Sequence, residues 1–379
     1  MTKRNILFAF LFALLALIIS YVSTNLNIVI SGERDVLKYW SIVDKFFSRK
    51  PEKTVPDDVL FINVSYDKQI VERTDEWGDL LGNAAITDRK KLADLLGLIQ
   101  TVGNYEYVLL DVFFEKGFVT EYDSLLFERI ASMDRIVIPR HVDGTLASDL
   151  LVGKAAYADF TTTLREDNFT KYPLLTPKTR NESFPLKMYS EITGRTVKKF
   201  GPIYTDKACL SRRVIFPKMY VQDNGLYPIY MNLGVELLDS RNNRDWNKLF
   251  GNKIIVIGSF VEDDIHLTYA GFAPGCVINY NVFASLMRGQ HRISVLLLLA
   301  YFMVFFVMAW LMLRGDSANS QSLAWIWAKL FVLYSVVLTI ACILVFEVWG
   351  QAHDVFITST FFSLVDTGRR WINNRKKNA

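Results

Sequence analysis

The segment KIIVIGSFVEDDIHLTYAGFAPGCVINYNVFASLMRG, which spans Lys253 to Gly289, carries the strongest information about the fold. It begins with four consecutive β-branched residues at positions 254–257, and such a short apolar run is typical of a strand buried on both faces of a parallel sheet. An acidic, polar loop follows between Glu262 and Thr268. After Pro274, apolar side chains recur at helical spacing over Val277–Met287. The segment therefore predicts a buried strand, a polar loop and a helix in succession.

The chain upstream of this segment shows the same alternation of strands and helices. Short apolar runs and amphipathic spacing predict three strands and two helices, at Val59–Val64, Arg89–Thr101, Tyr107–Val112, Tyr122–Ser132 and Arg135–Pro139. This order is the pattern of right-handed crossover units. We therefore expect an α/β domain with a mostly parallel sheet built from βαβ units.

The region between His141 and Asp245 has a less regular pattern. Ala155–Phe160 and Asn168–Leu175 are interpreted as the two strands of a hairpin, and Phe184–Ile192 as a helix. We interpret this region as an inserted middle region that decorates the same domain.

Composition narrows the class of protein. The 379 residues are 51% hydrophobic and 22% charged, which indicates apolar segments attached to a globular body, and a net charge of +4 gives no nucleic-acid footprint.

Of the three cysteines, Cys342 lies in an apolar segment, which leaves Cys209 and Cys276 as the pair in the body that could form a disulfide. We favour two unpaired, buried thiols, because the spacing of these two residues demands no bond.

Four apolar segments predict membrane crossings. The first has its apolar core at Ile6–Ile19 after Lys3 and Arg4, with no small-residue cleavage site behind it, so we expect an uncleaved signal anchor rather than a cleaved signal peptide. The others are Ile293–Leu313, Trp325–Val348 and the weaker Ala352–Trp371. An interfacial helix is the alternative for the last segment. A fourth crossing is favoured because it places the basic C-terminal residues in the cytoplasm.

These crossings set the predicted domain organisation. We expect an N-terminal transmembrane anchor at 1–24, an extracytoplasmic domain at 25–292, a three-helix transmembrane region at 293–371 and a basic cytoplasmic tail at 372–379. Both termini would then lie in the cytoplasm of a bacterium, and the main domain would lie outside its inner membrane.

The body and this topology resemble the second type of CHASE domain, a family of extracellular sensory modules. The residues that carry the resemblance are Asp58–Val64 followed by Asp67, Arg89, Val108–Phe114 with Asp111, Asp123, Ile255–Ser259, Asp264–Thr268, Pro274-Gly275 and Asn279 or Asn281. Tyr269 stands where the family has proline, and the tryptophan and proline that usually neighbour the arginine are absent. Family members usually continue into a cytoplasmic kinase or cyclase, which this sequence does not show.

The resemblance implies a sensor or input protein. We expect it to bind a small extracytoplasmic ligand or protein, and to pass the signal through its transmembrane helices to a separate cytosolic or membrane effector. The lipid bilayer is a further expected partner, assembly with copies of itself is left open, and no nucleic acid is expected. The alternatives are a structural subunit of a membrane complex and an extracytoplasmic hydrolase that uses Asp264 and His266.

The predicted binding site lies where the parallel strands end. Ligands of open α/β sheets bind at the carboxyl edge, and the proposed ligand-binding residues are Asp67, Arg89, Asp111, Asp264, His266 and Thr268. On an extended strand, the alternate residues Asp264, His266 and Thr268 point to the same side. They are too few for a structural zinc site, so neither a metal nor a cofactor is expected. A hydrogen-bonded loop, with the strand-end carboxylates capping helices, is the alternative interpretation.

The sequence contains none of the common catalytic motifs that we searched for. The sequence contains no G-x-S-x-G, H-E-x-x-H, Walker A or G-x-G-x-x-G motif. We therefore predict no catalytic residue.

Overall fold

A computed structural model gives the fold of the chain. It describes residues 3–26, 37–43, 58–75, 77–142, 144–159, 168–176, 181–219, 231–232, 245–261, 264–314, 336, 339–351 and 355–378. The chain forms two compact units. One comprises residues 1–47, 197–216 and 289–379, and the other comprises residues 48–196 and 217–288.

The second unit is built on a six-stranded sheet in which all paired neighbours run parallel. The strand order is β13-β1-β14-β4-β5-β6. The strands are β1 (Val59–Asn63), β4 (Tyr107–Leu110), β5 (Ile136–Arg140), β6 (Ala155–Tyr157), β13 (Met231–Asn232) and β14 (Ile254–Gly258). The predicted parallel α/β sheet is therefore confirmed, and the segment from Lys253 supplies one of its inner strands.

Helices cover the sheet on both faces. They are α3 (Arg89–Val102), α4 (Asp123–Ser132), α5 (Phe184–Thr193), α6 (Trp246–Phe250) and α7 (Gly275–Met287), with the 3₁₀ turn η1 (Asp149–Leu151). Alternate strand residues such as Leu60, Val108 and Ile255 share one buried core with α3, α4 and α6. The intervening residues face the other way, and Phe61 makes an edge contact with Tyr280 of α7. Each fully buried Leu, Ile or Phe stabilises the fold by about 1.5–3 kcal/mol.

Local signals fix the ends of α3. The Asp88 side chain accepts a hydrogen bond from the backbone N–H of Lys91, which satisfies a free donor at the helix start. Gly103 ends the helix at φ 73°, a left-handed conformation in which its N–H donates to the Ile99 carbonyl. These caps explain why the helix begins and ends within one residue of its predicted range.

The middle region differs from its prediction. Residues 155–157 form β6 at the edge of the main parallel sheet, so they belong to the domain's own sheet. The predicted hairpin is wrong, because β7 (Asn168–Phe169) instead pairs in parallel with β15 (Ile265–Thr268). The turn predicted between the two strands falls in residues 160–167, outside the described residues. The predicted helix is confirmed as α5, and β8 (Tyr172–Pro173) precedes it.

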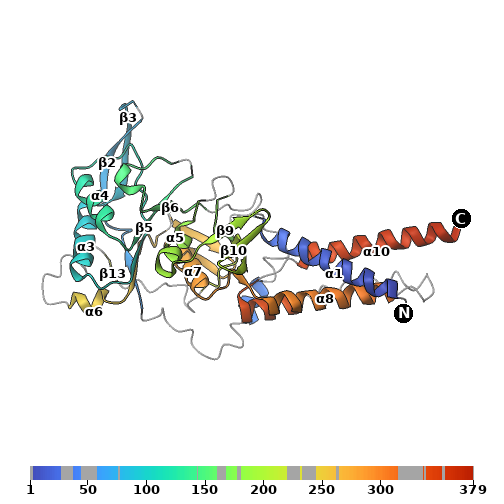
Figure 1. Ribbon diagram of the computed structural model, residues 1–379. Coiled ribbons are helices and arrows are strands. Elements are labelled where there is room, and N and C mark those ends of the chain that lie inside the picture. Colours follow the sequence, from blue (N-terminus) through green and yellow to red (C-terminus); the bar gives the residue numbers. More distant parts are fainter. Residues whose placement is uncertain are drawn as a thin grey trace. The chain divides into compact units, whose positions relative to one another are not determined.

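Two hairpins were not anticipated from the sequence. One joins β15 to β16 (Gly271–Pro274) just before α7. The other joins β2 (Lys68–Thr74) to β3 (Leu80–Thr87) and extends away from the rest of its unit (Figure 1). Most of its residues are exposed, so the hairpin lacks the run of buried residues from which a strand can be predicted.

The first unit contains the apolar helices α1 (Lys3–Thr24) and α8 (Val295–Arg314), which lie side by side (Figure 1). Both are long and apolar enough to cross a membrane. Small residues of α1, namely Ala9, Ala13, Ala16 and Ser20, are buried, and the three alanines share a core with α8. Small residues at this spacing let transmembrane helices approach closely.

The remaining predicted crossings stay predictions. Most of Trp325–Val348 lies outside the described residues, and only Thr339–Trp349 is described as a short apolar helix. The last segment forms α10 (Val355–Asn378), which is not among the helices long and apolar enough to cross a membrane. Its Arg369 donates hydrogen bonds to the carbonyls of Met312 and Leu313 near the end of α8, where a cation is favoured.

A small antiparallel sheet completes the described strands of this unit. Its order is β17-β11-β10-β9, formed by Arg292–Ile293, Cys209–Ser211, Ile203–Asp206 and Val197–Phe200; β12 is Val214–Ile215. Asp206 is buried and accepts hydrogen bonds from Arg292 at 2.6 Å, with His291 2.9 Å away.

Candidate functional site

The carboxyl ends of β4 and β14 meet the start of α7. Gly258 ends β14, and a Cβ on this residue would lie 2.6 Å from the Cβ of Cys276 in the first turn of α7. Atoms this close would clash, so only glycine lets the helix begin directly against the sheet. Asp111, the first residue after β4, also lies beside Gly258, 3.3 Å from that position.

Asp111 belongs to a hydrogen-bonded chain that crosses from the sheet to α7. Its Oδ2 accepts from the Asn279 side-chain amide at 2.9 Å, and the Asn279 oxygen accepts from the Tyr172 hydroxyl at 2.9 Å. Loss of water contact, together with the neighbouring Asp264 carboxylate, raises the pKa of Asp111 to about 7, against an opposing contribution from Asn279. A carboxyl group with such a pKa changes charge close to neutral pH.

Asp264 and His266 reach the same place from the β15–β16 hairpin. His266 Nε2 lies 3.2 Å from Asp264 Oδ1, and both residues act electrostatically on Asp111. Asp264 also occupies the space beside Gly275, where a Cβ would lie 2.5 Å from its Oδ1. A carboxylate at this position faces the positive end of α7, which is a favourable interaction. The structure thus brings together three of the predicted site residues.

The other three predicted residues have different environments. Asp67 accepts a hydrogen bond from Lys91 at 2.8 Å. Arg89 is only 2% exposed and stacks over the Phe114 ring at 4.5 Å. Thr268 donates to the Gly271 carbonyl and accepts from the Ala270 N–H, so it closes the β15–β16 turn. These contacts give each of the three a structural role.

Burial changes the ionisation of the arginine. The pKa of Arg89 is lowered to about 10 by loss of water contact, which outweighs the attraction of Asp123. Its Nε lies 3.7 Å from Asp123 Oδ1, and within the described part of the chain neither Nε nor Nη1 has a hydrogen-bond partner. The guanidinium remains positive at neutral pH and balances the Asp123 charge.

Sequence reasoning missed a second group at this edge, centred on His141. The ring stacks on Phe113 at 4.1 Å, its Nδ1 lies 2.5 Å from Asp159, and its Nε2 lies 3.7 Å from Glu115. His141 directly follows β5, and Asp159 follows β6 by two residues. A signal was available for His141, which follows the predicted strand Arg135–Pro139, but not for Asp159, which lay inside the predicted strand Ala155–Phe160. The Asp159 and Asp111 charges also add to burial in raising the pKa of Tyr172.

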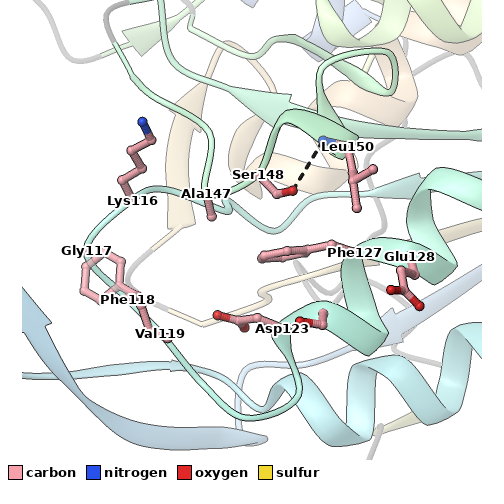
Figure 2. Close-up of a pocket in the computed structure, with 11 residues that line it drawn as sticks. Lys116, Gly117, Phe118, Val119, Asp123, Phe127, Glu128, Ala147, Ser148 and Leu150 are labelled. Atoms are coloured by element: carbon pink, nitrogen blue, oxygen red, sulfur yellow. Dashed lines mark hydrogen bonds between the residues drawn. The ribbon is translucent and has the colours of Figure 1, made fainter.

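A cavity of about 390 Å³ lies between the loops that follow β4 and β5, and none of Asp111, Asp264, His266 or His141 lines it. Its walls come from the loop after β4, the first turns of α4 and the loop after β5 (Figure 2). In Figure 2, the Phe127 ring and the Asp123 carboxylate point into the space from α4, and Phe118 lies across from them. The lining residues are Lys116, Gly117, Phe118, Val119, Asp123, Ser124, Phe127, Glu128, Ala147, Ser148 and Leu150. The cavity joins aromatic and aliphatic walls to charged groups of both signs.

The chemistry of the site suits binding and proton exchange. The carboxylate oxygens accept hydrogen bonds, and Asp111, whose pKa is raised to about 7, can exchange a proton near neutral pH. The Cys276 thiol beside them is a poor nucleophile, because burial and the Asp111 and Asp264 charges raise its pKa well above the usual value. Across the described residues, no three His, Cys, Asp or Glu side chains gather as a metal site. Both Cys209 and Cys276 are free, as expected, but only Cys276 is buried, so the expectation of a buried thiol at Cys209 is wrong.

Comparison with known proteins found no match to a protein-family model, to a curated protein or to a solved structure.

Proposed function

We propose that this chain is a membrane-anchored sensor whose α/β domain lies outside the cytoplasm and binds a small polar ligand at the carboxyl edge of its sheet. The observation that carries the proposal is that Asp111, from the end of β4, meets Asp264 and His266, from the β15–β16 hairpin. Three such groups at one strand-end edge are the arrangement expected of a ligand site in an open α/β sheet.

The ligand class follows from the charges. Asp111, Asp264, Asp159 and Glu115 supply acceptor oxygens around the edge, while the nearby cavity supplies the aromatic rings of Phe118 and Phe127 and aliphatic walls. A small molecule that bears an ammonium or several hydroxyl groups fits acceptors of this kind. The likeness to the second type of CHASE domain supports a sensory role, since its matching blocks include the ends of β4 and β14.

Ligand binding is tested with the full chain in detergent micelles. A panel of amino acids, small amines and polyols is screened by thermal shift, and each hit is titrated by calorimetry against the wild type, Asp111→Asn and Asp79→Asn. Asp79 lies near the tip of the β2–β3 hairpin and serves as the matched control. We expect a compound that Asp111→Asn binds at least about tenfold more weakly, because a charge-assisted hydrogen bond is lost. Equal affinities for both variants would place the ligand site elsewhere.

Sidedness is tested through the exposed thiol of Cys209. Spheroplasts that express the chain are treated with a membrane-impermeant maleimide before and after lysis. The proposed topology predicts full labelling of intact spheroplasts and none of the Cys209→Ser variant. Labelling of Cys209 only after lysis would place the body in the cytoplasm and remove the extracytoplasmic part of the proposal.

A further inference from the structure

Strand β3 presents an uncharged open edge. Its eight residues, Leu80–Thr87, read LLGNAAIT and contain neither a charged residue nor proline. β3 pairs with β2 on one side, and no other described strand pairs with it. Leu80 and Leu81 are 61% and 59% exposed. The strand therefore offers free backbone donors and acceptors beside exposed apolar side chains.

Open edges of this kind are usually blocked, because they pair readily with other chains. Charged side chains, prolines and bulges are the usual obstacles. The opposite edge of the same hairpin has them: β2 carries Lys68, Glu72 and Arg73, and Arg73 already bridges to Phe118. A register irregularity near Leu81 is the one such device on β3. The asymmetry between the two strands marks β3 as the strand left open for pairing.

The absence of charge on β3 favours one kind of partner. β3 has no charged side chain that could form cross-strand ion pairs with a charged peptide, whereas another uncharged strand of the same length can pair with it along its whole length. A second copy of β3 is such a strand, and antiparallel pairing about a two-fold axis meets no like-charge repulsion. We propose that β3 is a dimerisation edge, through which two copies of this chain join their hairpins into one four-stranded sheet.

Dimerisation would also stabilise the hairpin itself. A two-stranded sheet is marginally stable alone, and three or more strands are needed for independent stability. Pairing of β3 with its copy also covers the free edges of both copies, so that the assembly closes at two chains. If the pair is centred on Asn83, Leu80 of one copy lies opposite Ile86 of the other, and such apolar cross-strand pairs are favourable.

One lysine placed on each strand of the hairpin tests the proposal. Asn83→Lys puts two ammonium groups face to face across the two-fold axis, while within its own hairpin the new lysine lies opposite Glu72. Ile70→Lys is the matched control, because it adds the same charge to an exposed position of β2. The mass of the full chain in detergent is measured by light scattering over a range of concentrations, and circular dichroism checks the fold.

We expect the wild type and Ile70→Lys to be dimers, and Asn83→Lys to need about tenfold more protein to dimerise, because like charges directly opposite destabilise a strand pair. A wild-type monomer at every concentration would overturn the proposal, and so would equal effects of the two lysines. A second measurement uses cysteines in a Cys209→Ser background. Asn83→Cys should form a disulfide-linked dimer rapidly under mild oxidant, since directly opposite Cβ atoms lie about 4.5–5.5 Å apart. Cross-linking no faster than that of Ile70→Cys would contradict the pairing.

Discussion

Substitution of Asp111 by asparagine should stabilise the protein in a pH-dependent way. The folded carboxyl group has a pKa of about 7, against an ordinary value of 3.8, because it loses contact with water and lies near Asp264. The folded state therefore binds more protons than the unfolded state between these two pH values. The free energy of unfolding falls as pH rises through this window, and the ionised carboxylate destabilises the fold fully above pH 7.

The size of the effect follows from the pKa difference. The interval from 3.8 to about 7 corresponds to about 4 kcal/mol at most. Asp111 is only partly buried, so solvent screening reduces this figure, and we expect about 2 kcal/mol above neutral pH. Asparagine removes the charge at nearly constant shape, and its oxygen can still accept the hydrogen bond from Asn279. The variant should therefore melt about 4–8 °C above the wild type at pH 8, and within about 1 °C of it at pH 4.

The assay is thermal unfolding of the full chain in detergent, followed by tryptophan fluorescence from pH 4 to pH 8. Asp79→Asn removes the same charge from the tip of the β2–β3 hairpin and should give no gap that opens with pH. A stability gain of Asp111→Asn that is the same at pH 4 and pH 8 would refute the reasoning, because the gain would then have no connection with ionisation. A loss of stability at pH 8 would refute it as well.

Three further substitutions test the packing around the site and within the first unit. Gly258→Ala places a Cβ 2.6 Å from the Cβ of Cys276, so it should cost about 1–3 kcal/mol of unfolding free energy, measured by denaturant titration. Asp206→Ala removes the buried carboxylate that His291 and Arg292 contact and should cost about 3–5 kcal/mol in the same titration. Ala13→Phe enlarges a buried position in the core shared by α1 and α8 and should lower the melting temperature in detergent by several degrees through overpacking. An unchanged midpoint for any of the three would contradict the contact that it tests.

The sheet was predictable because its strands are buried on both faces. Residues 59–62, 107–110 and 254–257 are continuous apolar runs, and their burial in the structure is nearly complete. The β2–β3 hairpin gave no such signal, since most of its side chains face solvent. Pairing of β7 with β15 joins segments nearly a hundred residues apart, which local patterns cannot reveal.

The site was predictable to the extent that strand ends define it. Asp111 stands directly behind β4, and Asp264 and His266 share one side of an extended segment, so their meeting follows from alternation and topology. The contacts of Arg89 could not be predicted, because on a helix the direction of a side chain depends on the rotation of the helix, and here the guanidinium lies over the Phe114 ring. The turn between β15 and β16, which sets the hydrogen bond from the Thr268 hydroxyl to the Gly271 carbonyl, was not predicted either.

Helix α7 gives the site a physical route for communication along the chain. Its first turn touches Gly258 and Asp264, its Asn279 binds Asp111, and only seven residues separate its end at Met287 from the start of α8 at Val295. A change of charge at Asp111 acts on the Asn279 contact of this helix, since the hydrogen bond from Asn279 favours the ionised carboxylate. A ligand that prefers one protonation state would shift that equilibrium only by its difference in affinity for the two states. Signalling through the charge of Asp111 would therefore require that ligand affinity and the pKa of Asp111 depend on each other, and a ligand that binds equally well at pH 5 and pH 8 could not act on this helix in that way.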